Sequence, residues 1–148
     1  MTRFVRQIEV PPPPGEAFAY VADFATTAEW DPGIVEARRL DDGPLGGGSR
    51  FEVVSAFGER RLPITYTITA FEPPSRIVLE GVGERFRGTD EIRFAPGADG
   101  GTRIDYIADL ALRGVARVAE PFMRGRFEQV VDEGSIGLER TLRSRAAT

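Results

Sequence analysis

Four residue types are missing from this chain, and each absence excludes a kind of chemistry. The sequence contains no cysteine, histidine, lysine or asparagine. Without cysteine there is no disulfide, thiol nucleophile or thiolate metal site. Without histidine and lysine there is no Ser-His-Asp catalysis, no histidine-based metal site and no Schiff base to a carbonyl substrate. Acid-base chemistry is therefore left to Asp, Glu and Tyr, because all 19 basic residues are Arg, which stays protonated. We expect neither a metal nor a cofactor.

Length and charge restrict the class of protein further. The chain has 148 residues, which fits a single domain over residues 1–148 with a core of its own. The formal net charge of −4 at pH 7 argues against nucleic acid as a general partner. No apolar run approaches the roughly 18 residues that a transmembrane helix needs. The first residues are charged at Arg3 and Arg6 and lack the apolar centre of a signal peptide. We therefore expect a cytoplasmic protein with no integral membrane contact.

The spacing of apolar residues predicts the order of the secondary structure elements. Phe4, Ile8 and Val10 share one phase of a first strand. Pro14 suits the first position of a helix, and Thr26 begins a capping box that predicts a second short helix. Alternation of period two then predicts six strands, over residues 34–41, 49–58, 60–72, 75–85, 87–95 and 101–112.

The last segment, residues 114–145, has a helical period, and Pro121 marks a break within it. This helix is needed because the predicted strands have one apolar and one polar face, which is typical of an antiparallel sheet covered on one side. The face that needs covering is clearest in one strand, along Leu62, Ile64, Tyr66, Ile68 and Ala70. The pattern predicts an α+β fold in which the long C-terminal helix packs on the sheet.

Five segments, in order along the chain, carry a resemblance to a known family. They are Ile8 to Pro11, Ala17 to Phe24, Trp30 to Pro32, Phe71 to Leu79 and Asp99 to Tyr106. On these segments the chain resembles the polyketide cyclase/dehydrase-like family of the START-like (SRPBCC) superfamily. The resemblance implies a helix-grip fold, with a curved antiparallel sheet of about seven strands wrapped around a long C-terminal helix and a cavity between them. Members of the superfamily include cyclases, lipid carriers, hormone receptors and co-chaperones, so the fold is implied better than the function.

Seven residues are candidates for contact with a ligand in such a cavity: Trp30, Phe57, Tyr66, Tyr106, Met123, Phe127 and Gly134. A buried Tyr needs a partner for its hydroxyl, which can be a ligand carbonyl or a group of the protein itself. Gly134 leaves room either for a ligand or for close packing of the helix on the sheet. Trp30 is placed to gate the cavity or to plug one end of the sheet.

Asp90 and Arg85 are the candidates for catalysis. Asp90 shares the phase of Ile92 and Phe94 and is expected to point inward, where burial raises the pKa of a carboxyl group towards that of a general base. Arg85 shares the phase of Leu79 on the preceding strand. The alternative is an ion pair between Arg85 and Asp90 at a solvated hairpin end, since residues 85–90 span a turn.

Three functions remain open at this point. The first is binding of a small apolar or aromatic molecule, such as a lipid or polyketide. The second is a cofactor-free cyclase or dehydratase that uses Asp90, Arg85 and a Tyr. The third is a protein-interaction module of the co-chaperone kind. The expected partner is a small hydrophobic ligand, and a homodimer is also open.

Overall fold

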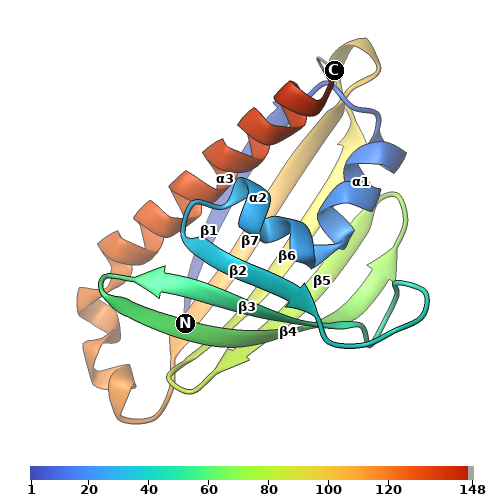
Figure 1. Ribbon diagram of the computed structural model, residues 1–148. Coiled ribbons are helices and arrows are strands. Elements are labelled where there is room, and N and C mark those ends of the chain that lie inside the picture. The colour runs from blue at the N-terminus through green and yellow to red at the C-terminus, as the bar shows by residue number, and fades with distance from the viewer. Residues whose placement is uncertain (147–148) are drawn as a thin grey trace.

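The computed structural model describes residues 1–146, and its elements follow the predicted order (Figure 1). The strands are β1 (Thr2–Val10), β2 (Ile34–Arg39), β3 (Arg50–Phe57), β4 (Arg60–Glu72), β5 (Arg76–Gly83), β6 (Phe86–Pro96) and β7 (Thr102–Leu112). The α-helices are α1 (Pro14–Ala22), α2 (Thr27–Trp30) and α3 (Arg124–Ala146). Three short 3₁₀ helices complete the chain: η1 (Phe24–Thr26), η2 (Ala98–Gly100) and η3 (Gly114–Phe122).

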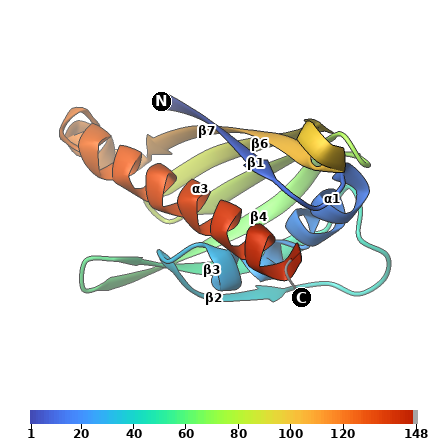
Figure 2. The same ribbon diagram turned by 90° about the horizontal axis from the view of Figure 1, so that it is seen from above.

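All seven strands form one antiparallel sheet in the order β1-β7-β6-β5-β4-β3-β2. The sheet curves, and in Figure 2 α3 lies between the edge formed by β1 and β7 and the edge formed by β2 and β3. The segment from α1 to α2 closes the side of the space near the C-terminal end of α3 (Figure 1). This arrangement confirms the predicted helix-grip fold.

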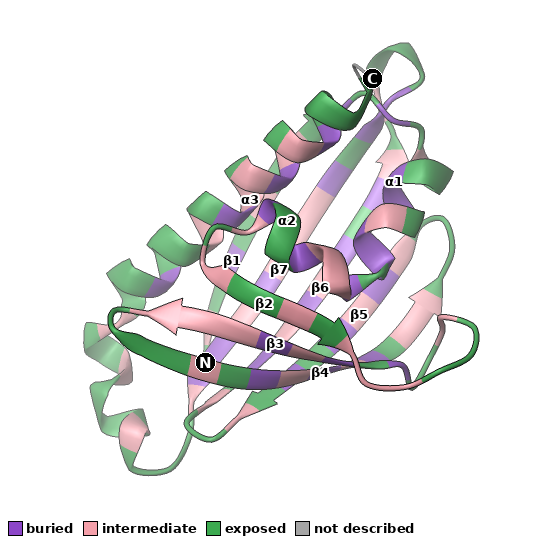
Figure 3. Cartoon of the chain, in the orientation of Figure 1, coloured by how far each residue is buried: buried purple, intermediate pink, exposed green. Residues whose placement is uncertain are grey.

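Buried residues alternate with more exposed ones along the strands (Figure 3). The register explains why: Phe51 of β3 pairs with Tyr66 of β4, and Val53 pairs with Ile64, so buried side chains stand opposite one another on the same face. Leu138 and Leu142 of α3 are fully buried against this face. The solid part of the core therefore fills the half of the molecule next to the C-terminal half of α3.

Two local differences from the predicted pattern have clear causes. A bulge in β4 between Ile68 and Ala70 shifts the alternation by one residue. Phe71, rather than the predicted Ala70, then packs against the core from a partly buried position, with its ring centroid 5.4 Å from that of Phe18. The second difference lies before the predicted break at Pro121: residues Gly114–Phe122 form the 3₁₀ helix η3, and the α-helix begins only at Arg124.

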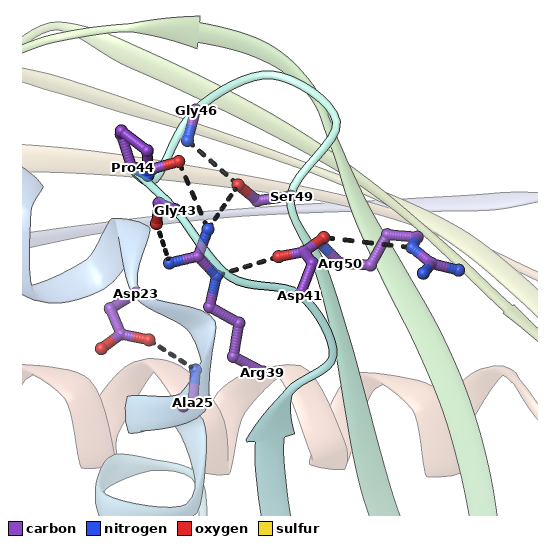
Figure 4. A network of polar contacts seen from close by, with 9 residues as sticks. All are labelled: Asp23, Ala25, Arg39, Asp41, Gly43, Pro44, Gly46, Ser49 and Arg50. Atoms are coloured by element: carbon purple, nitrogen blue, oxygen red, sulfur yellow. Dashed lines mark hydrogen bonds and ion pairs between the residues drawn. The ribbon is translucent and has the colours of Figure 1, made fainter.

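The long connection from β2 to β3 is held by the guanidinium group of Arg39 (Figure 4). Its nitrogens donate to the carboxylate of Asp41 at 3.0 Å and to the carbonyl oxygens of Gly43 and Pro44 at 2.9 and 3.3 Å. The other oxygen of Asp41 accepts from the backbone N–H of Arg50 at 2.9 Å. The glycine-rich stretch before β3 is thus a turn ordered by protein contacts.

Close contact between α2 and α3 depends on Gly137. A Cβ atom at this position would collide with the carbonyl oxygen of Trp30. The missing side chain lets the end of α2 rest directly on the backbone of α3, which fixes the loop that follows Trp30 over the sheet. Among residues 1–146 no helix combines the length and the hydropathy that crossing a bilayer requires.

Candidate ligand-binding site

A cavity of about 320 Å³ lies between the sheet and the N-terminal half of α3. Its walls are mainly apolar and come from several elements, and they include Ile34, Leu62, Ile64, Phe86, Leu110, Leu112, Phe127 and Val131. The inner end is closed by the buried side chains of Trp30, Tyr66 and Asp90. The mouth lies between the β3–β4 hairpin and the β5–β6 turn, where exposed charged residues line it.

Asp90 points into this cavity, as its phase on the strand predicts. Its side chain is only 7% exposed, and one carboxylate oxygen, Oδ2, accepts a hydrogen bond of 2.7 Å from the hydroxyl of Tyr106. Burial raises the pKa of Asp90 to about 6, the charge of Asp31 adds to the rise, and the bond from Tyr106 opposes it. The raised pKa brings this carboxyl group closer to the range of a general base than an exposed Asp would be.

A second carboxylate, Asp31, reaches the same cavity from the end of α2. Its Oδ1 accepts from the backbone N–H of Gly33 at 2.9 Å. A Cβ atom at Gly134 of α3 would lie 3.3 Å from its Oδ2, so the small residue makes space for this carboxylate. Burial raises the pKa of Asp31 to about 6, and the charge of Glu133 contributes, while the bond from Gly33 opposes the rise.

Tyr66 brings a free hydroxyl to the inner end of the cavity. Its side chain is 9% exposed, and the ring lies over Gly81 of β5, where a Cβ atom would come within 2.6 Å of Cε1. Within residues 1–146 its hydroxyl oxygen has no hydrogen-bond partner. Burial, followed by the charges of Asp90 and Asp31, holds the pKa of Tyr66 well above its usual value. The hydroxyl is therefore a neutral donor and acceptor that is available to a ligand.

Arg85 is placed differently from Asp90. Strand β5 ends at Gly83, two residues earlier than predicted, and Arg85 lies exposed in the turn at the mouth. From Phe86 to Asp90 the strand advances by about 13 Å, so these two charges sit at opposite ends of the cavity. No ion pair joins Arg85 to Asp90 in the described part of the chain, and the predicted alternative of a solvated pair at the hairpin end does not form.

The predicted ligand-contact residues separate into two groups. Lining the cavity are Trp30, Phe57, Tyr66, Tyr106, Phe127 and Gly134. Met123 does not line it and packs beside η3 against a smaller cluster formed around Phe4 and Phe127. The ring of Trp30 closes the inner end of the cavity and also packs edge-on against Phe24 and Tyr106. Trp30 therefore forms part of the cavity wall and also plugs one end of the sheet, which is one of the two roles that the sequence suggested for it.

Asp31 is the residue that sequence reasoning overlooked. Asp followed by Pro-Gly indicates a turn, and the bond from the N–H of Gly33 to Oδ1 is the bond that such a turn makes. Nothing in the local pattern shows that the second oxygen faces a cavity. That position depends on the packing of α2 against Gly134 and Gly137, which lie about a hundred residues later in the chain.

The site combines acid-base groups with an apolar wall. Two carboxylates with pKa values of about 6 and two neutral tyrosine hydroxyls surround the inner end. Such groups can bind a polar substituent of an apolar ligand, and they can also move a proton. In the described residues no three side chains suited to a metal ion come together.

Solved structures of similar fold share low sequence identity with this chain. A Thermus thermophilus protein superposes with a TM-score of 0.80 at 15% identity, covering 99% of both chains. The Zhui aromatase/cyclase from a Streptomyces species gives a TM-score of 0.77 at 15% identity, covering 99% of this chain and 93% of its own. A START superfamily protein from Mycobacterium smegmatis gives 0.76 at 15% identity, covering 96% and 97%. At these identities the likeness concerns the fold alone.

Comparison of the sequence with known protein families identifies the family of this chain. No curated protein is similar enough to count as a relative. The profile of the family described as polyketide cyclase/dehydrase and lipid transport, in contrast, matches residues 1–143. This match covers nearly the whole chain and agrees with the helix-grip fold. The chain therefore belongs to the polyketide cyclase/dehydrase and lipid transport family.

Proposed function

We propose that this protein binds a small apolar or aromatic molecule in the cavity between the sheet and α3. The observation that carries the proposal is the cavity itself, about 320 Å³ of apolar-walled space beside a solid core. This volume lies at the lower end of the range for small-molecule sites, which is roughly 300–1,000 Å³. The titratable groups of its lining lie at its two ends, with only the hydroxyls of Ser55 and Ser135 as further polar side chains, as expected for a site that orients an apolar ligand. An open cavity gives no support to the alternative of a protein-interaction module.

Filling the cavity is expected to abolish binding. Ser55 of β3 lines the cavity, whereas its neighbour Ala56 projects to the other face of the sheet. We expect Ser55→Trp to lower the affinity for the neutral fluorophore N-phenyl-1-naphthylamine at least ~10-fold, since the indole occupies the space that a ligand needs. Fluorescence titration measures this.

Ala56→Trp is the matched control and is expected to bind the fluorophore like the parent protein. Circular dichroism establishes that both variants are folded. A folded parent protein that shows no saturable binding, or equal binding by the two variants, would remove the cavity as the binding site. Native mass spectrometry of protein purified gently from its source then identifies the natural ligand by its mass.

A second function, cofactor-free acid-base catalysis, is favoured by the hydrogen bond between Tyr106 and Asp90. An ionised Asp90 can remove a proton next to a ligand carbonyl, while the free hydroxyl of Tyr66 donates to the carbonyl oxygen. These are the elements of enolisation and aldol-type ring closure. Arg85, at the mouth, is placed to contact the outer end of a substrate rather than its reacting atoms.

For this activity we expect Asp90→Asn to reduce turnover of a neutral polyketide-like substrate at least ~100-fold, because a positioned general base contributes that much or more. Affinity for the same substrate should change little. The measurement is product formation together with a separate binding titration. Undiminished turnover in the folded variant would show that Asp90 is not the base.

A further inference from the structure

We infer that the ligand of this cavity carries a protonated amine on an apolar ring or chain, and that its ammonium group binds at the inner end between Asp31, Asp90 and Tyr66. The inference rests on the proposed binding function and specifies the class of ligand. It follows from the charges at the inner end, from the free hydrogen-bonding atoms there and from the size of the space.

The charges at the inner end are all of one sign. Asp31 and Asp90 both line it, and the charge of Asp31 acts on Asp90 strongly enough to raise its pKa. Neither carboxylate forms an ion pair in residues 1–146. The cations that line the cavity are Arg60, Arg61 and Arg85, and all three are exposed at the mouth. Buried carboxylates without a cation are costly, so a ligand that brings a positive charge relieves the largest electrostatic penalty in the site.

Three acceptor atoms are open at this end, one from each of the three residues. The Oδ1 of Asp90 and the Oδ2 of Asp31 are the carboxylate oxygens that are not already used by Tyr106 and Gly33. The hydroxyl oxygen of Tyr66 is free and belongs to a side chain that is nine-tenths buried. An ammonium group has three N–H donors and no acceptor, so its donors equal the open acceptors in number.

The surrounding aromatic residues suit the same group. The rings of Trp30, Tyr66 and Tyr106 lie at the inner end of the cavity, and aromatic faces attract cations, by about 2 kcal/mol or more where water is excluded. A bound alcohol or carbonyl would use at most part of the acceptor set. A carboxylate would add a third negative charge to two that are already close.

A matched series of naphthyl compounds tests the inference. The probes are 1-naphthylmethylamine, 1-naphthylmethanol and 1-naphthoate, which share a ring system and carry positive, zero and negative charge at pH 7.5. We expect the amine to bind at least ~10-fold more tightly than the alcohol, since a hydrogen bond to a charged group contributes roughly 1.5–3 kcal/mol. The naphthoate should bind most weakly. Isothermal titration calorimetry measures all three.

Variants assign the preference to its residues. Asp90→Asn and Asp31→Asn are each expected to weaken binding of the amine ~10-fold or more and to leave that of the alcohol within ~3-fold, because each removes one charged acceptor. Glu91→Gln, on the opposite face of β6 and engaged by Arg76 and Arg93, is the control and should change none of the affinities. If one of the two Asp variants does not fold, the affinities of the other variant still test whether the preference for the amine depends on these carboxylates.

The outcomes separate the inference from the function on which it rests. Tighter binding of the amine by the parent protein, lost in the folded Asp variants, supports the inference. Equal binding of amine and alcohol overturns it and leaves the apolar binding function standing. Failure of all three probes and of N-phenyl-1-naphthylamine to bind would overturn both.

Discussion

Replacing Gly137 by Ala is expected to destabilise the protein by about 2 kcal/mol, although Ala is the better helix former. Overpacked positions typically cost roughly 1–3 kcal/mol, and helix propensity returns only about 1 kcal/mol. The cost here lies at the upper end because the added methyl group meets the carbonyl oxygen of Trp30, which is backbone and cannot rotate away. Helix α2 must therefore lift from α3. Urea unfolding followed by circular dichroism measures the change.

Two other glycines of α3 provide the comparison. A Cβ atom at Gly125 meets nothing within 4 Å, so Gly125→Ala should stabilise by up to about 1 kcal/mol through helix propensity alone. At Gly134 the atom nearest to an added Cβ is the Oδ2 of Asp31 at 3.3 Å, a side-chain atom that can shift slightly. The change in stability for Gly134→Ala should therefore lie between those for Gly137→Ala and Gly125→Ala. If Gly137→Ala were as stable as Gly125→Ala, the direct contact between α2 and α3 would not exist in solution.

Replacing Asp90 by Asn is expected to stabilise the folded protein at pH 7.5 by about 2 kcal/mol. Burial raises the pKa of Asp90 from 3.8 to about 6. Each unit of such a shift corresponds to about 1.4 kcal/mol, so the ionised carboxylate costs about 3 kcal/mol in the folded state. Asn removes this cost, but its amide group lacks a hydrogen-bond partner in the folded state, which destabilises the variant by about 1 kcal/mol. Parallel urea unfolding of the two proteins at pH 7.5 measures the difference.

The dependence on pH distinguishes this effect from a general change in packing. Because the pKa of Asp90 is higher in the folded state, the folded protein binds the proton more tightly, and the penalty is present above pH 6 and absent below about pH 4. The stability advantage of Asp90→Asn should therefore disappear as the pH falls through this window. An advantage that stayed constant from pH 7.5 to pH 4 would rule out an ionised, buried Asp90.

Glu91→Gln is the control, because the pKa of Glu91 is shifted in the opposite direction to that of Asp90. Hydrogen bonds and charges from Arg76 and Arg93 hold the pKa of Glu91 below its usual value of 4.5, and burial only partly opposes them. The stabilisation from this carboxylate is present above its unfolded pKa and is lost as the pH falls through the folded one. The variant should lose no more than about 1 kcal/mol at pH 7.5, as for other partly exposed ion pairs.

The fold was predictable from the sequence because it depends on patterns that repeat over many residues. Alternation along six segments and a helical period over residues 114–145 outweigh any single misplaced residue. The bulge after Ile68 illustrates this: it moved Ala70 off the buried face and brought in Phe71, yet β4 kept its predicted bounds. The register of a bulge depends on the partner strand and is not visible locally.

The candidate site was predictable only in part, since it depends on where strands end and how loops pack. The phase of Asp90 was enough to place it inside the cavity. Arg85 was assigned to a strand that in fact ends at Gly83, and the turn carries its side chain to the mouth. Asp31 could not be recognised, because its position follows from a contact between α2 and the glycines of α3 that no short-range pattern encodes.

The arginines at the mouth have a consequence for the speed of binding. Three guanidinium groups and the carboxylate of Glu84 surround the entrance, while the carboxylates of Asp31 and Asp90 lie at the inner end. A cationic ligand must then pass a rim of its own sign before it reaches the groups that hold it. Salt screens such repulsion over roughly 8–10 Å, so added salt should accelerate the entry of a cation and slow that of an anion. Affinity and rate of entry are thus set by opposite ends of one cavity.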